Sequence, residues 1–435
     1  MVTCAKEKRL ILTITLLPRT SCLKGSRMVT IGRIPEKAQA FFKGLAGRFS
    51  ARAFRHFWGL VLAMTIGYGS TIDRLARLLR GSTHRTKHGE FLWRSDWRES
   101  ALLQEVALET LRQLHRKDGG TCYLILDETQ TLKRAKKMAG VRKLYHHATG
   151  KFGTGHTMVK ACLYYRGVTI PWSTALCLRQ EDAQKEDQVF LTQTALAAYV
   201  IHNADLPRDI PVKVLFDSYY LCDVVVDACV ARGWHYIGVG KGNRNLFVDG
   251  QKKKLEPYGR NVLARRGQWR NVPGLRKGGT YRLASRVGFM KKLGQVKVVF
   301  SRRRNENKVV ALVTDDLGAS MMSIVADYLK RWSIELLIKD EKQQLGLGDY
   351  RVLRYRSVVR HLHLVDIAYA CLTRLALDSQ DEQGQHQNEK VLRLPPISHL
   401  KARMRHVVWQ EAIEDVVKHT HEKAVLRRLE RLLAA

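Results

Sequence analysis

Four polar side chains stand at fixed spacing in the stretch 328–342, YLKRWSIELLIKDEK. On a regular α-helix, Tyr328, Arg331, Glu335 and Lys342 fall within roughly a 60° arc. The other sides of this predicted helix are mostly apolar, which indicates a buried helix with one polar stripe. Such a stripe could bind a metal ion through its carboxylate and the phosphates of a polyanion through its cations.

An ordinary ion-pair ladder is the alternative interpretation of this stripe, because Glu335 lies four residues from both Arg331 and Lys339. Two features favour the functional interpretation. The apolar belt is wide for a surface helix, and a base that precedes its acid is the weaker order for such a pair. The functional interpretation predicts further acids at strand ends elsewhere in the chain.

Two such acids follow short apolar runs that are typical of strands buried on both faces. Asp127 follows Cys122–Leu126, and Asp217 follows Val212–Phe216. An acid at the end of a strand often only caps the next turn, and Glu128 and the pair 315–316 are competing acids. If Asp127, Asp217 and Glu335 converge, each pair repels by roughly 1 to 4 kcal/mol. Two Mg²⁺ or Mn²⁺ ions would remove that repulsion, so this cluster implies them as cofactors.

The pattern Tyr328-x2-Arg331-x3-Glu335-x6-Lys342 resembles the YREK signature of bacterial insertion-sequence DDE transposases. This resemblance implies that Glu335 is the third acid of a catalytic, metal-binding triad. It also implies that Tyr328, Arg331 and Lys342 bind DNA phosphates near the transposon end.

The same resemblance implies an α/β fold, namely an RNase H-like mixed sheet flanked by helices. In that fold the first two acids lie on the first and fourth strands, where Asp127 and Asp217 occur. A β-rich insertion precedes the third acid, and the Gly-rich, basic stretch between 240 and 316 has that character. The resemblance therefore assigns Asp127, Asp217 and Glu335 as the catalytic residues and metal ligands.

Changes of hydrophobic period along the chain predict its domains. Apolar residues at helical spacing predict a helical domain before the first strand, with basic side chains at 71–88 that could contact DNA phosphates. We predict an extension at 1–29, a helical DNA-binding domain at 30–119, the catalytic core at 120–241 and 317–378, a β-rich insertion at 242–316, and a linker with C-terminal helices at 379–435.

The charge of the chain points to nucleic acid. Lys and Arg number 75 against 40 Asp and Glu, which gives a net charge of +35. Such an excess repels itself unless a polyanion neutralises it, so we expect double-stranded DNA as the partner. A membrane partner is excluded, because the longest apolar run, Phe57–Tyr68, is far shorter than the ~20 residues that span a bilayer.

The first residues and the cysteines predict the compartment. Residues 6–18 resemble a signal peptide, but basic residues follow and no small-residue cleavage site is evident, so we expect translation to start at Met28. Eight scattered cysteines without a C-x-x-C pair indicate reduced thiols. We therefore expect a cytoplasmic, nucleoid-associated protein.

The expected function is that of a DDE transposase. It would cleave DNA at transposon ends and join the 3′-hydroxyl ends to target DNA by two-metal-ion phosphoryl transfer, as a homodimer in the DNA complex. A catalytically silent DNA-binding descendant and a nuclease of the same fold without strand transfer are the alternatives. Some relatives use a tryptophan to extrude a base, but for Trp269 we expect a packing role, and hairpin formation at the DNA end stays open.

Overall fold

The computed structural model describes residues 31–79, 84–115, 120–135, 137–146, 149–273, 279–382 and 391–418, with the backbone only for 415–418. The expected extension at 1–29, including Met28, lies outside these residues. So do 383–390 of the expected linker and 419–435 of the expected C-terminal helices.

The N-terminal part is helical, as the apolar spacing predicted. The side chains of Ser50 and Thr71 accept hydrogen bonds from backbone N–H groups of the first turns and so cap the second and third helices. A fourth helix begins at Arg85, within the stretch 71–88 whose basic side chains we expected to contact DNA phosphates. The five helices are α1 (Glu36–Leu45), α2 (Ala51–Ile66), α3 (Ile72–Arg77), α4 (Arg85–Arg94) and α5 (Glu99–Leu114).

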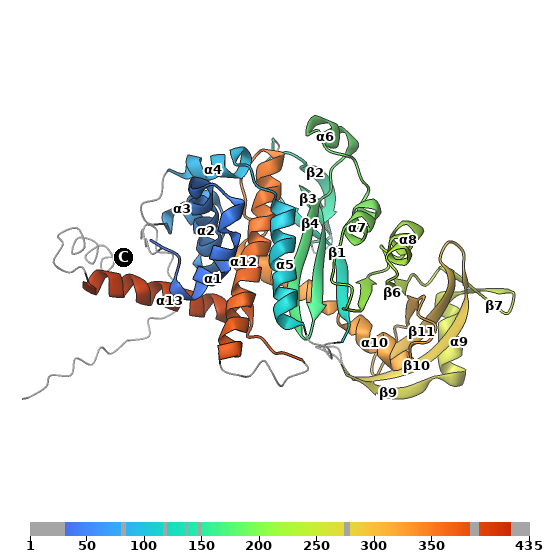
Figure 1. Ribbon diagram of the computed structural model, residues 1–435. Helices are drawn as coiled ribbons and strands as arrows, with labels where there is room; N and C mark the ends of the chain where they lie inside the picture. Colours follow the sequence, from blue (N-terminus) through green and yellow to red (C-terminus); the bar gives the residue numbers. More distant parts are fainter. Residues whose placement is uncertain are drawn as a thin grey trace, which may run out of the picture.

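The centre of the molecule is a mixed α/β unit, consistent with an RNase H-like DDE fold (Figure 1). Five strands lie side by side in the order β4-β3-β1-β5-β6, with β1, β3 and β4 antiparallel and β1, β5 and β6 parallel. A short β2 pairs with the first part of β3. Their bounds are β1 (Cys122–Leu132), β2 (Arg142–His146), β3 (Lys151–Tyr165), β4 (Val168–Leu176), β5 (Val212–Phe216) and β6 (His235–Gly240).

Beyond β6 the chain forms a β-rich region that extends the same sheet. Its last strand, β12, pairs antiparallel with β6, so the described strands form one 12-stranded sheet. A helix, α9, packs on these strands (Figure 1). The elements are β7 (Asn245–Val248), β8 (Gln251–Lys254), α9 (Leu255–Arg266), β9 (Gln268–Val272), β10 (Gly279–Met290), β11 (Gly294–Arg303) and β12 (Val310–Thr314).

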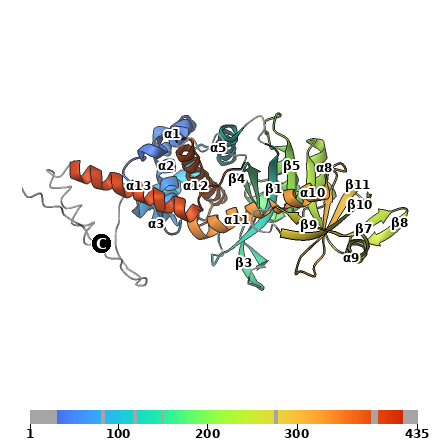
Figure 2. The same cartoon turned by 90° about the horizontal axis from the view of Figure 1, so that it is seen from below.

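Each face of the central sheet has its own apolar core. On β1 the side chains alternate, so that Tyr123 and Ile125 enter one core while Leu124 and Leu126 enter the other. The first face is covered by α10 (Met321–Leu329), α11 (Trp332–Asp340) and α12 (Tyr355–Glu382), and α11 crosses β1, β3 and β4 (Figure 2). The second face is covered by α5, α7 (Gln193–His202) and α8 (Asp223–Ala231), and α6 (Gln180–Lys185) precedes α7.

The long helix α12 joins the N-terminal helices to the sheet. It contacts α2, α4 and α5 as well as β4, and it is buried along most of its length. A last helix, α13 (Ile397–Lys418), packs against α12 and α2 (Figure 2). Within the ranges described above, no helix combines the length and the apolar character needed to cross a bilayer.

Candidate active site

Asp127 and Asp217 occupy equivalent positions on two neighbouring parallel strands. Ile125 of β1 pairs with Leu215 of β5, and each aspartate lies two residues beyond that pair. Since side chains alternate along a strand, both aspartates project from the face that α10 and α11 cover. β1 does not end at Leu126 as we expected but continues to Leu132, so Asp127 lies within the strand.

The carboxyl group of Asp127 is largely buried and close to the other two acids. Burial raises its pKa to about 6, and the charges of Asp217 and Glu335 add to the rise. The guanidinium of Arg331 and the N–H of Glu128, which donates to Oδ1 at 2.8 Å, act in the opposite direction. A nearby cation would therefore stabilise the ionised form of this carboxyl group.

Asp217 is oriented by the turn that follows β5. Its Oδ1 accepts hydrogen bonds from the backbone N–H of Tyr219 at 2.8 Å and of Tyr220 at 3.4 Å. These bonds hold the carboxylate at the carboxyl end of the strand, as in an Asx turn. They leave its other oxygen available for a ligand.

The segment 328–342 is not the single regular helix that we expected. Tyr328 lies in the last turn of α10, Lys330 and Arg331 form a turn, and Glu335 lies in the first turn of α11. A π-helical turn, Glu341–Leu345, then contains Lys342. The predicted polar stripe is therefore divided over three short segments.

Arg331 joins two of the three acids. Its Nη1 lies 2.9 Å from Asp127 Oδ2, its Nη2 contacts Glu335 Oε1, and its guanidinium lies 5.9 Å from the centre of the Tyr328 ring. Burial opposes its charge, yet Tyr328, Asp127 and Glu335 outweigh burial and raise the pKa of Arg331. Arg331 is thus a charged guanidinium held between two carboxylates.

Tyr328 lies in the same cluster, whereas Lys342 lies apart from it. Burial raises the pKa of Tyr328 to about 12, and the nearby charges of Asp217 and Asp127 contribute to this rise. The pKa of Lys342 is lowered by desolvation and by repulsion from Lys160, because the π-helical turn places it beside that residue. Of the other five predicted site residues, four gather around Asp127 and Lys342 does not.

The donor chemistry of the three acids suits a hard divalent cation, because all the candidate ligands are carboxylate oxygens. In the described part of the chain, however, no three Asp, Glu, His or Cys side chains are close enough to hold a metal ion as they stand. Arg331 occupies the position between Asp127 and Glu335 and supplies the positive charge there. The three acids can share a cation only if Arg331 releases at least one carboxylate.

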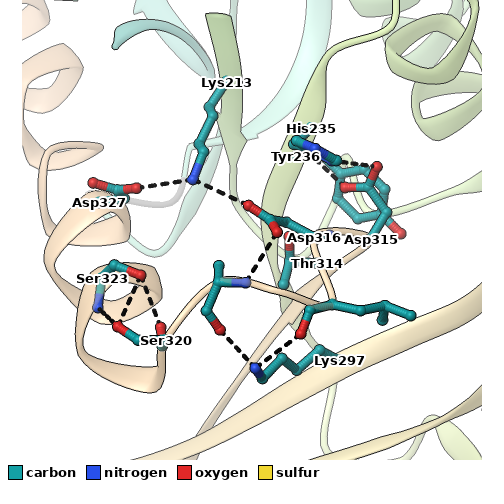
Figure 3. Close-up of polar contacts among 12 residues, drawn as sticks. Lys213, His235, Tyr236, Lys297, Thr314, Asp315, Asp316, Ser320, Ser323 and Asp327 are labelled. Atoms are coloured by element: carbon teal, nitrogen blue, oxygen red, sulfur yellow. Dashed lines mark hydrogen bonds and ion pairs between the residues drawn. The ribbon is translucent and has the colours of Figure 1, made fainter. Parts of the chain in front are cut away.

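A second ionic network holds α10 on the sheet beside this cluster (Figure 3). Lys213 of β5 lies 3.3 Å from Asp327 and 3.4 Å from Asp316, while the hydroxyl of Tyr123 donates to Asp327 at 2.6 Å. Our sequence analysis missed Lys213 and Asp327. The sequence pattern could have identified both residues, since each is a single charged residue within an otherwise apolar run.

The competing acids are engaged in other contacts. Asp315 accepts hydrogen bonds from His235 and from the backbone N–H of Tyr236, and Asp316 accepts one from Ala319 (Figure 3). Glu128 projects to the opposite face of β1 and accepts from the side-chain amides of two glutamines, Gln130 and Gln193. None of these contacts involves the side chain of Asp127.

Trp269 does not have the packing role that we expected. Its side chain lies on β9 with 45% of its surface exposed, and the guanidinium carbon of Arg302 lies 5.8 Å from the ring centre. An exposed aromatic ring beside an arginine offers a flat stacking surface.

Comparison with known proteins was informative at the level of the family. A search of curated proteins gave no match. The crystal structure of the NurA nuclease from Sulfolobus solfataricus resembles this one at 9% identity, over 62% of this chain and 85% of that chain, with a TM-score of 0.23. At that score the likeness carries no functional argument.

A family model described as DDE superfamily endonuclease matches residues 45–282. The matched region spans more than half of the chain and includes Asp127 and Asp217, and it ends before Glu335. The chain therefore belongs to the DDE superfamily endonuclease family.

Proposed function

We propose that this protein is a DDE transposase that cleaves double-stranded DNA at transposon ends and joins the 3′-hydroxyl ends to target DNA. The observation that supports the proposal most is the equivalent register of Asp127 and Asp217 on neighbouring strands, with Glu335 linked to Asp127 through Arg331. Three acids from two strands and a helix, on one sheet face, are what two-metal phosphoryl transfer requires.

Asp127, Asp217 and Glu335 would hold Mg²⁺ or Mn²⁺, which when bound activates the attacking oxygen and stabilises the leaving oxygen. Arg331 and Tyr328 lie beside these acids and are suited to hold a DNA phosphate, the first through its planar fork and the second through its hydroxyl. Such contacts position the DNA without reading its sequence.

Arg331 would have two tasks in turn. Without DNA it neutralises Asp127 and Glu335; with DNA its fork would move to a phosphate, which frees both carboxylates for the cation. Lys342 would reach DNA only at a distance from this cluster. We retain Lys342 as a candidate phosphate contact, together with a homodimer on DNA and the helical N-terminal part as a DNA-binding domain.

The test is a cleavage assay on DNA that carries the flanking ends of the encoding element, with Mg²⁺, Mn²⁺ or EDTA. We expect metal-dependent nicking at the ends that is lost in Asp127→Asn, Asp217→Asn and Glu335→Gln, with DNA binding retained. Glu128→Gln is the matched control, since this neighbouring carboxylate faces the other side of β1. It should cleave at the wild-type rate.

A supercoiled target plasmid added to the same reaction tests the joining step. Joined products support the transposase. Cleavage without joined products would identify a nuclease of this fold, and tight, salt-sensitive binding without nicking under any metal would identify a silent DNA-binding descendant.

A further inference from the structure

A buried lysine lies directly beside Asp127 in the sheet. In the pairing of β1 with β3, Lys160 is the residue opposite Asp127, and in the pairing of β3 with β4, Thr174 is opposite Lys160. Side chains opposite each other in antiparallel strands project from the same face, with Cβ atoms roughly 4.5–5.5 Å apart. Asp217, Asp127, Lys160 and Thr174 therefore form one polar row across four strands.

Lys160 is fully buried and binds two carboxylates from different elements. Its Nζ lies 2.6 Å from Glu341 Oε2 and 2.6 Å from Asp366 Oδ1, and all three side chains have at most 1% of their surface exposed. Thr174 donates to the second oxygen of Asp366 at 2.7 Å. Lys160 thus connects β3 to α12 through Asp366 and to the π-helical turn through Glu341.

The charges of this buried group balance only if one carboxyl is protonated. Burial raises the pKa of Glu341 well above its ordinary range, whereas Lys160 and hydrogen bonds lower the pKa of Asp366 despite burial. Glu341 is therefore the neutral acid of the two. The result is a Lys⁺, Asp⁻ and neutral Glu, with no net charge left in the core.

Glu341 begins the π-helical turn that continues α11 and that carries Lys342 as its next residue. Such turns are rare and are frequently found at functional sites. Here Lys401 donates to the carbonyl of Gln344, and Ser70 donates to that of Gly346 at 2.7 Å. Because these contacts hold the far end, loss of Lys160 would displace the near end without unfolding the turn.

We propose that Lys160 is a positioning residue for DNA cleavage, which fixes α11 and the π-helical turn over Asp127 by binding Glu341 and Asp366. The inference rests on the proposed function, since it concerns how Glu335 and Lys342 are placed for that reaction. Because its ammonium is fully buried between two carboxylates, Lys160 would contact neither DNA nor a metal ion. It holds the helix that carries Glu335 at a fixed height above the row of strands.

Two variants of Glu341 distinguish the loss of its contact with Lys160 from the loss of its charge. Glu341→Gln keeps the shape of the protonated acid and an oxygen that can accept from Lys160, so it should cleave DNA within about twofold of wild type. Glu341→Leu is also neutral but cannot bind Lys160, and a displacement of Glu335 by about 1 Å should lower the cleavage rate tenfold or more. DNA affinity should change little in either variant.

The double variant Lys160→Met, Asp366→Asn removes the anchor and leaves no buried charge unpaired. We expect it to fold, to bind DNA and to cleave at least about tenfold more slowly, with a higher Mg²⁺ concentration needed for half-maximal rate. Leu111→Ala, in the other core, is the control for general loss of stability. At a temperature where both are folded it should cleave as wild type does.

Hydrogen exchange of residues 332–345, measured without DNA or metal, provides a readout that does not depend on activity. It should rise in Glu341→Leu and in the double variant, and stay unchanged in Glu341→Gln and Leu111→Ala. Wild-type cleavage by the folded anchor-free variants, or equal losses in Leu111→Ala, would overturn the proposal. If wild type itself does not nick DNA, the proposed function fails, and exchange that rises uniformly over the chain would still overturn the positioning role.

Discussion

Arg331 Nη1 lies 2.9 Å from Asp127 Oδ2, and the same guanidinium contacts Glu335. A cation of the protein thus occupies the space between two candidate metal ligands. This arrangement keeps the acids together without a metal ion, because it removes most of the repulsion between their charges. It also makes Arg331 a competitor of any divalent cation.

Removal of Arg331 should therefore strengthen metal binding in the absence of DNA. We expect Arg331→Ala to bind Mn²⁺ several-fold more tightly than wild type, because the charge that competes for Asp127 and Glu335 is gone. Isothermal titration calorimetry measures this directly. The double variant Arg331→Ala, Asp127→Asn should lose this increase in Mn²⁺ affinity. An unchanged affinity in Arg331→Ala would show that the guanidinium does not compete with the metal ion for the two carboxylates.

The same variant should weaken DNA binding. If Arg331 holds one phosphate, Arg331→Ala should reduce the slope of log affinity against log salt concentration by about one. Arg331→Lys keeps the charge but lacks the planar fork, so it should keep most of the slope and lose part of the affinity. Fluorescence anisotropy at several salt concentrations checks both variants, and an unchanged slope in Arg331→Ala would remove Arg331 from the DNA contact.

Lys213 should stabilise the fold through its two carboxylates (Figure 3). Lys213→Met leaves Asp316, which is mostly shielded from water, short of a cation, while Asp327 keeps its pair with Lys330 at 2.6 Å. It should lower the free energy of unfolding by about 1–3 kcal/mol. Urea titration measures the loss. Lys292→Met is the matched control, because the Lys292–Asp223 pair is exposed and should contribute much less.

His156 should make stability dependent on pH. Its ring is fully buried, with Nε2 donating to the carbonyl of Ala139 at 2.9 Å and Nδ1 accepting from the hydroxyl of Tyr350 at 2.6 Å. Burial lowers the pKa of His156 from 6.5 to about 4. Between these values the unfolded chain binds a proton that the folded chain does not, so stability falls as the pH falls.

For one histidine this loss amounts to about 1.4 kcal/mol per pH unit within that window. His156→Gln keeps a donor for Ala139 and removes the titrating group, so its free energy of unfolding should depend on pH less steeply than that of wild type. Denaturant unfolding at pH 7.5, 6 and 5 gives the comparison. The exposed His202 offers a control, since His202→Gln should retain the wild-type pH slope.

The sequence predicted the elements with strong hydrophobic periods and missed those held by polar contacts. Buried runs such as Cys122–Leu126 and Val212–Phe216 were identified, and so was the helical character of the N-terminal part. The continuation of β1 to Leu132 was missed because residues 127–131 are polar, although they pair with β3 and Thr129 and Thr131 are buried. The helix α4 was not singled out, because its first half is polar and basic and its buried apolar side chains, Phe91 and Leu92, both lie in its second half.

The candidate site was predictable where residue type and spacing were distinctive, and not where backbone geometry decided the outcome. The types and spacing of Tyr328, Arg331 and Glu335 identified the segment, but a uniform 100° per residue ignored the turn at Arg331 and the π-helical turn. That error moved Lys342 away from Asp127. Lys160 was overlooked because the sequence alone does not distinguish a buried, paired lysine from an exposed one.

The pairing of β12 with β6 has a mechanical consequence. A module on a flexible tether can swing toward its substrate, but strands bonded edge to edge into one sheet bend very little. Whatever lies on the outer strands is held at a set distance and angle from Asp127. The β-rich region and the central strands therefore form one rigid body, and any molecule that contacts both must match their fixed geometry.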